Sequence, residues 1–207
     1  MSGRTLHALL FLAGALGLCP PARGAESSAD ASWEQAMQRG KQLWMQGNLT
    51  EAEAVLEGVL RQANVSGRDD PRVAMTLNGL GSVYQDMGRY GEAEQSYRSA
   101  VLALEKTHGK DDPTLASALH NLADLYMETG QYEKAEPLLR QSLSIRTAAL
   151  GPDDPDVAMT LNNLGALYNI LQEDDRAPTT QTVKEVGTLR SQLDTLLAQW
   201  RQLKTRM

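Results

Sequence analysis

Large apolar residues recur every three or four positions along much of this chain, which is the spacing of one face of an α-helix. Val73, Leu77, Leu80 and Tyr84 form the clearest such stripe. A second stripe follows it directly and consists of Tyr90, Ala93, Tyr97, Ala100, Val101 and Leu104. The two stripes predict a pair of helices joined by a short turn.

The ends of the first predicted helix carry start and stop signals. Asp70 can accept hydrogen bonds from the free amides of the first turn, and Pro71 suits the first helical position because its missing amide costs no bond there. Gly88 ends the helix, since the chain turns there with positive φ and glycine has no Cβ to clash. The same start occurs at Asp112-Pro113 and Asp154-Pro155, and the same stop at Gly130.

The whole pattern returns at a fixed interval of 42 residues, marked by Pro71, Pro113 and Pro155. The same step relates Leu77 to Leu119 and Leu161, Leu80 to Leu122 and Leu164, and Tyr84 to Tyr126 and Tyr168. A fainter copy lies 41 residues earlier, at Gly40, Leu43, Gly47, Ala52, Leu56 and Val59. Such a period predicts an all-α stack of helix pairs whose function lies on a surface rather than in an enzyme cleft.

The second helix of the next unit contains a proline. Its apolar positions are Tyr132, Ala135, Leu139, Leu143 and Ile145. We interpret Pro137 as compatible with a helix that starts near Gln131, because the missing amide would fall in the unpaired first turn.

The order of Leu, Leu, Gly or Ala, and Tyr, followed by Gly-x-Tyr-x-x-Ala, resembles the tetratricopeptide repeat. Leu-Asn-Asn-Leu at 161–164 and Tyr-Glu-Lys-Ala-Glu-Pro-Leu-Leu at 132–139 are similar to the 42-residue type found in kinesin light chains. The resemblance covers about 32–168 and implies a right-handed superhelical stack of antiparallel helix pairs, an α-solenoid. It implies no particular partner, because these repeats serve many unrelated scaffolds.

We therefore expect a repeat domain over 32–177, followed by a linker over 178–181. Its units are predicted near 32–69, 70–111 and 112–153, with a partial unit over 154–177. An amphipathic helix is then predicted over 182–206. Thr182 and Glu185 form a capping box at its start, and the apolar residues at three-four spacing are Val186, Leu189, Leu193, Leu196, Trp200 and Leu203. This helix either covers the exposed end of the array or associates with a second copy or a partner.

The first 24 residues are predicted to be an export signal. Arg4 precedes an apolar run of 11 residues over 8–18, and Ala-Arg-Gly at 22–24 is a small-x-small cleavage site. The run is too short to span a bilayer, which needs about 20 residues. Two other interpretations stay open, namely a buried first helix and a lipoprotein signal that is acylated at Cys19. We expect an exported protein, periplasmic or secreted, in which 25–31 is a linker.

Removal of this segment leaves 18 of the 20 basic side chains and all 26 acidic ones, a net charge of −8. Such a chain lacks the basic patches that bind nucleic acid and anionic lipid, so we expect neither as a partner. Its only cysteine is also lost, so helix stacking rather than disulfides must stabilise it. Asn48-Leu49-Thr50 and Asn64-Val65-Ser66 are glycosylation sequons, which matter only in a eukaryotic host.

Motifs for catalysis or metal binding are weak in this sequence. His108 and His120 lack zinc-ligand spacing, and Gly79-Leu80-Gly81 lies inside a predicted helix rather than after a strand. The Asp-Asp pairs at 69–70, 111–112 and 153–154 are better explained as helix starts than as calcium ligands. We therefore expect no enzyme activity, no cofactor and no metal.

The first helices of stacked pairs line the inner side of the array, so their polar positions are the candidate binding site. These positions are Met75, Asn78, Ser82, Gln85, His120, Asn121, Asp124, Met127, Met159, Asn162, Asn163 and Asn169. Asn can hold the backbone of any peptide, and Met adapts to varied apolar side chains. The resemblance implies that Asn121 and Asn163 line a peptide groove. The alternative is that these amides are merely solvated or bond neighbouring loops.

These observations predict a non-catalytic scaffold that binds a protein or peptide partner in the groove of the repeat array. The alternative is a structural subunit of an envelope assembly. Such a subunit would act through the helix over 182–206 or through a lipid anchor.

Overall fold

The computed structural model describes residues 28–66 and 70–173 together with Thr188 and Ser191. The predicted export signal, Cys19 and the linker over 178–181 lie outside these residues. So does the predicted helix over 182–206, apart from Thr188 and Ser191.

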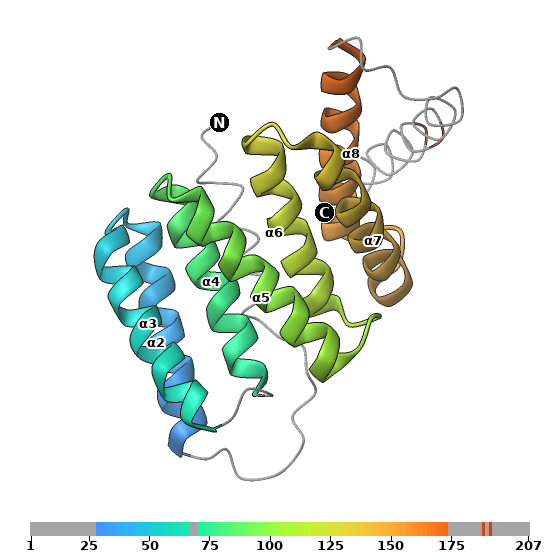
Figure 1. Cartoon of the computed structure of the whole chain (residues 1–207). Helices are drawn as coiled ribbons and strands as arrows, with labels where there is room; N and C mark the ends of the chain where they lie inside the picture. Colours follow the sequence, from blue (N-terminus) through green and yellow to red (C-terminus); the bar gives the residue numbers. More distant parts are fainter. Residues whose placement is uncertain (1–27, 67–69, 174–187, 189–190, 192–207) are drawn as a thin grey trace, which may run out of the picture.

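Within the described residues the chain forms seven α-helices and no strand, which confirms the all-α prediction. They are α2 (Ser28–Met45), α3 (Leu49–Ser66), α4 (Pro71–Asp86), α5 (Tyr90–His108), α6 (Pro113–Glu128), α7 (Tyr132–Leu150) and α8 (Pro155–Glu173). Figure 1 shows a row of helix pairs that runs from α2 and α3 at one end to α8 at the other. The first helix begins at Ser28, inside the segment that was expected to be a linker.

Three helices begin at the predicted Asp-Pro signals. Asp70 Oδ1 accepts a hydrogen bond from the Arg72 amide at 2.9 Å. Asp112 and Asp154 accept the corresponding bonds, each at 2.8 Å, from the amides two residues later. Each carboxylate therefore caps a helix, because its side-chain oxygen satisfies an amide that the first turn leaves unpaired.

The turns within the pairs use glycine in the left-handed region. Gly88 has φ 73° and Gly130 has φ 72°, as the sequence predicted. The amide that follows each glycine donates a hydrogen bond to a carbonyl oxygen of the first helix. The distances are 2.9 Å from Arg89 N to Tyr84 O and 2.7 Å from Gln131 N to Tyr126 O. The second helix can therefore begin at once and run back along the first.

Pro137 departs from the prediction. The second helix of its unit does begin next to Gln131, but Pro137 lies inside α7 and not in its unpaired first turn. The helix continues to Leu150 despite the lost amide, because α7 packs along α6 and α8 on either side.

The paired helices approach closely where the first helix has a glycine. A Cβ atom added to Gly81 would lie 2.5 Å from ring carbons of Tyr97, and one added to Gly40 would lie 2.8 Å from Leu56. Large buried residues from successive pairs belong to one continuous cluster, namely Leu56, Leu80, Tyr97, Leu122, Leu139 and Leu164, all at most 4% exposed. Burial of each such side chain contributes about 1.5–3 kcal/mol, so the stack of pairs stabilises itself. None of the described helices is long and apolar enough to cross a membrane.

Candidate partner-binding face

The first helices of the units lie side by side. In sequence order α2 contacts α4, α4 contacts α6 and α6 contacts α8, while α3, α5 and α7 form the other layer. We call the accessible surface of α2, α4, α6 and α8 the first-helix face. Figure 1 shows α4, α6 and α8 in successive positions along the row.

Hydrogen bonds join each first helix to the next. Asn121 Nδ2 donates to Asn78 Oδ1 at 3.1 Å, which links α6 to α4. Asn163 Nδ2 donates to Asp124 Oδ1 at 3.1 Å, which links α8 to α6. Asn121 and Asn163 occupy the same position of their units, so one amide position links two successive boundaries, with acceptors at different positions of the preceding first helix.

Two more bonds repeat near the ends of the first helices. Trp44 Nε1 donates to Asp86 Oδ2 at 2.9 Å, and Gln85 Nε2 donates to Glu128 Oε2 at 2.6 Å. In both, a side chain from one unit reaches an acidic residue on the next first helix, 42 or 43 residues later. The acidic residues there therefore hold neighbouring units together.

The twelve predicted site residues fall into three groups by exposure. Ser82, Gln85, His120, Asn121 and Asn163 are buried. Met75, Asn78, Asp124, Met127 and Met159 are half-buried, and Asn162 and Asn169 are exposed. Asn121, 2% exposed, and Asn163, 5% exposed, bond neighbouring helices and thus have a structural role. Their role toward a partner stays a prediction.

A second set of contacts joins second helices to the following first helices. Tyr126 Oη donates to Glu94 Oε1 at 2.8 Å, and Tyr168 Oη donates to Glu136 Oε1 at 2.8 Å. Burial, followed by the hydrogen bond to Glu94, raises the pKa of Tyr126 to about 12. Sequence reasoning assigned these tyrosines to the core and missed their partners, although Glu94 and Glu136 are also 42 residues apart.

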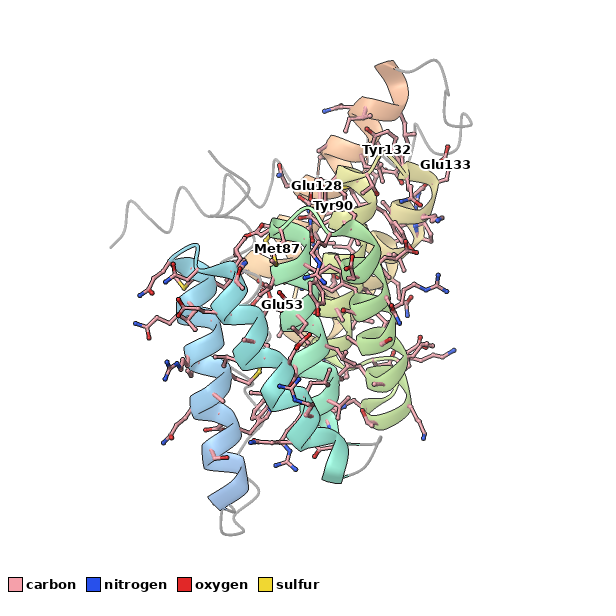
Figure 2. The ribbon with its side chains drawn as sticks, turned by 60° about the vertical axis from the view of Figure 1, so that its left-hand side comes forward. Glu53, Met87, Tyr90, Glu128, Tyr132 and Glu133 are labelled. Atoms are coloured by element: carbon pink, nitrogen blue, oxygen red, sulfur yellow. The ribbon has the colours of Figure 1, made fainter. Side chains whose placement is uncertain are left out.

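The turns between first and second helices form one edge of the array. Figure 2 shows Glu53, Met87, Tyr90, Glu128, Tyr132 and Glu133 along this edge. Tyr90, with 41% of its surface exposed, donates its hydroxyl to Glu128 Oε1 at 3.1 Å and so links α5 to α6. Arg89 Nη1 lies 2.6 Å from Glu53 Oε1 and links the second and first units. The polar contacts of this edge thus also hold successive units together.

Acidic side chains in the array have structural roles rather than metal-binding geometry. The second aspartate of each Asp-Asp pair caps a helix, at Asp70, Asp112 and Asp154. In the part of the chain that the structure describes, no three His, Cys, Asp or Glu side chains lie close enough together to hold a metal ion.

The family model of the tetratricopeptide repeat matches residues 34–106, 72–148 and 114–177. The chain belongs to the tetratricopeptide repeat family. Repeats of this family are generally protein-interaction modules and are typically not catalytic. Among the family models, none of a catalytic family matches this tetratricopeptide repeat protein.

Solved structures show the same fold. A Podosopora anserina protein described as a kinesin light chain, with nearly identical TPR-like repeats, has a TM-score of 0.69 at 22% identity. The match covers 85% of this chain and 78% of that one. BtubC (BKLC) from P. vanneervenii has a TM-score of 0.61 at 19% identity, over 87% of this chain and 90% of that one. Among curated proteins, none matches this tetratricopeptide repeat chain.

Proposed function

We propose that this tetratricopeptide repeat protein is a non-catalytic adaptor that binds a segment of a protein partner on its first-helix face. The observation that carries the proposal is the row of accessible methionine and amide side chains on successive first helices. Met75 on α4, Met127 on α6, and Met159 and Asn162 on α8 are half-buried or exposed. Methionine adapts to varied apolar side chains, and asparagine offers both a donor and an acceptor to a peptide backbone.

The charge of the chain favours a partner segment that is neutral or basic. Without the predicted signal the net charge is −8, and the residues predicted to line the face include Asp124 but no Lys or Arg. A carboxylate partner would meet no complementary cation among these residues. The expected ligand is therefore an extended segment with apolar side chains rather than a C-terminal carboxylate.

We also propose that the adaptor acts after export, because residues 1–24 have the pattern of a secretory signal. The mass of the mature protein purified from its own organism tests this. Cleavage near Ala25 supports a soluble periplasmic or secreted protein, and cleavage before Cys19 with acylation supports a membrane-attached one. An uncleaved chain contradicts export through this segment.

Site-specific crosslinking tests the binding face. A photoreactive amino acid is placed at Met75 or Met159 of the full chain in its own organism, and crosslinked peptides are identified by mass spectrometry. The matched control places it at Leu102, which is 66% exposed on α5 in the other helix layer. The proposal expects both methionine positions to capture neighbouring segments of one partner and Leu102 to capture none of it. Capture of that partner from Leu102 alone contradicts the proposed face.

Charged substitutions test the same face without a crosslinker. Met75→Asp combined with Met159→Asp is expected to weaken binding of the crosslinked partner by at least about tenfold, since it places charge against apolar ligand groups. Leu102→Asp is the control and is expected to leave binding unchanged. Equal binding by all three proteins would exclude these methionines from the interface.

A further inference from the structure

One boundary of the array is more polar than the boundary that precedes it. Five positions at the junction of α6, α7 and α8 differ together from the residues 42 positions earlier. Ser117, His120, Ser142, Arg146 and Thr160 stand where the preceding unit has Met75, Asn78, Ala100, Leu104 and Ala118. All five polar side chains are buried, and Leu104 and Ala118 belong to an apolar cluster at the earlier boundary. We call the five residues the polar joint.

Arg146 is the centre of the polar joint and is 1% exposed. Its Nη1 donates to Thr160 Oγ1 at 2.8 Å and to the Asp156 carbonyl at 3.1 Å, both on α8. The Asp156 carboxylate is further away, with Oδ2 4.0 Å from Nη2. The guanidinium is therefore held mainly by neutral oxygens, and burial lowers the pKa of Arg146 despite the attraction of Asp156.

His120 lies beside this cation and is completely buried. Its Nε2 is 3.1 Å from Asn163 Nδ2, and that same amide nitrogen donates to Asp124 Oδ1 at 3.1 Å. Asn163 Nδ2 is a donor, so we assign His120 Nε2 as its acceptor and the single ring proton to Nδ1, although Arg146 Nη1, also a donor, lies 3.5 Å from that second nitrogen. Nδ1 in turn faces Thr160 Oγ1 at 3.4 Å, which can accept from it. The contacts thus assign a neutral imidazole.

A second proton on His120 would disrupt these contacts. It would point from Nε2 at another donor, and it would place a positive charge next to Arg146, whose Nη1 is 3.5 Å from Nδ1. Among the described residues, Asp154 and Asp156 at the start of α8 are acidic groups that act on Arg146, and Asp124 on α6 contacts the ring through Asn163. Toward the opposite side, α4 and α5 approach α6 with the neutral side chains of Asn78 and Leu104. Complete burial and the adjacent cation both disfavour a second proton on the ring.

We propose that the polar joint is an acid-sensitive release for α8, opened by protonation of His120. In the unfolded or opened state an imidazole takes up a proton near pH 6.5, whereas the closed joint excludes that proton. The open state then binds more protons, so the stability of the closed joint falls as pH drops below about 6.5. Release of α8 removes Met159 and Asn162 from the first-helix face, so partner release on acidification would follow. That last consequence rests on the proposed function.

Hydrogen exchange of the full chain without a partner tests the joint itself. Protection factors, corrected for the intrinsic pH dependence of exchange, are measured by mass spectrometry at pH 7.5, 6.5 and 5.5. We expect protection in α8 to fall by up to about tenfold per pH unit below about pH 6.5, while α4 and α5 change little. Unchanged α8 protection, or an equal loss in all helices, overturns the proposal. Failure of the binding experiments above leaves this result unaffected.

A matched pair of variants identifies the titrating group. His120→Asn introduces the residue type found at the equivalent position one unit earlier, Asn78. It is expected to abolish the selective loss of hydrogen-exchange protection in α8. His108→Asn changes an exposed histidine at the end of α5 and is expected to keep it. If His120→Asn fails to fold, Arg146→Leu, which restores the residue found at Leu104, replaces it and is expected to reduce the pH dependence. If the pH-dependent loss of protection in α8 persists unchanged in whichever of these two variants folds, His120→Asn or Arg146→Leu, the proposal is overturned.

Discussion

The hydroxyl of Tyr126 donates to the carboxylate of Glu94 at 2.8 Å, across the boundary between two repeat units. Tyr168 and Glu136 repeat this contact at the same distance one unit later. The tyrosine belongs to the first helix of its unit and the glutamate to the second helix of the unit before. Each bond therefore joins two helix pairs rather than the two helices of one pair.

Loss of this bond should weaken the array measurably. Tyr126→Phe removes the hydroxyl, keeps the buried ring, and is expected to lower the free energy of unfolding by about 1–2 kcal/mol. Chemical denaturation followed by circular dichroism measures the change. Tyr132→Phe in the same unit is the control. Its free energy of unfolding is expected to stay within about 0.5 kcal/mol of the wild type, because Tyr132 is half-buried and lies at the edge of the array. Equal effects of the two would show that the bond to Glu94 adds nothing.

The same tyrosine predicts a loss of stability in strong base. The pKa of Tyr126 is raised in the folded protein to about 12, above the unfolded value of 10. The contribution of Tyr126 to the stability of the fold is thus complete below about pH 10. It is lost as pH rises toward 12, because the tyrosine ionises at lower pH in the unfolded chain than in the folded one. Melting temperatures between pH 9 and 12 should fall less steeply for Tyr126→Phe than for the wild type. An identical slope contradicts this assignment.

A single methyl group should distinguish two glycines at equivalent positions. Gly81→Ala places a Cβ 2.5 Å from the Tyr97 ring and is expected to cost about 1–3 kcal/mol of overpacking. Gly165→Ala, two units later, meets nothing within 4 Å and is expected to be neutral or to stabilise α8 by up to about 1 kcal/mol. Thermal unfolding compares the two. A destabilised Gly165→Ala would show that its space is occupied.

Adjacent asparagines on α8 should also behave differently. Asn163→Ala removes the amide shared by His120 and Asp124 and is expected to cost about 1–3 kcal/mol, because buried polar groups lose their partner. Asn162→Ala changes an exposed neighbour and is expected to stay within about 0.5 kcal/mol. Denaturant midpoints measure both. Similar midpoints would contradict the structural role of Asn163.

The helix pairs themselves could be predicted from local chemistry. Asp70 followed by Pro71 fixes a helix start, and Gly88 fixes a stop, because capping and positive φ depend on a few neighbouring atoms. The same start and stop signals recur after 42 residues, so the same helix pair forms again in each unit. Pro137 was placed less well, since packing on both sides of α7 outweighs the local cost of a proline inside it.

The sequence by itself determined that this protein is a stack of α-helix pairs, because helix ends and apolar stripes are read from residues close together in the chain. Only the tertiary structure decided which polar side chains remain accessible. Asn162 is exposed and Asn163 is buried, although the resemblance to the repeat family implied that Asn163 lines the peptide groove. The same holds for Arg146, whose burial among His120 and Thr160 depends on three helices that meet from distant parts of the chain. Burial is set by such long-range packing, which no local pattern contains.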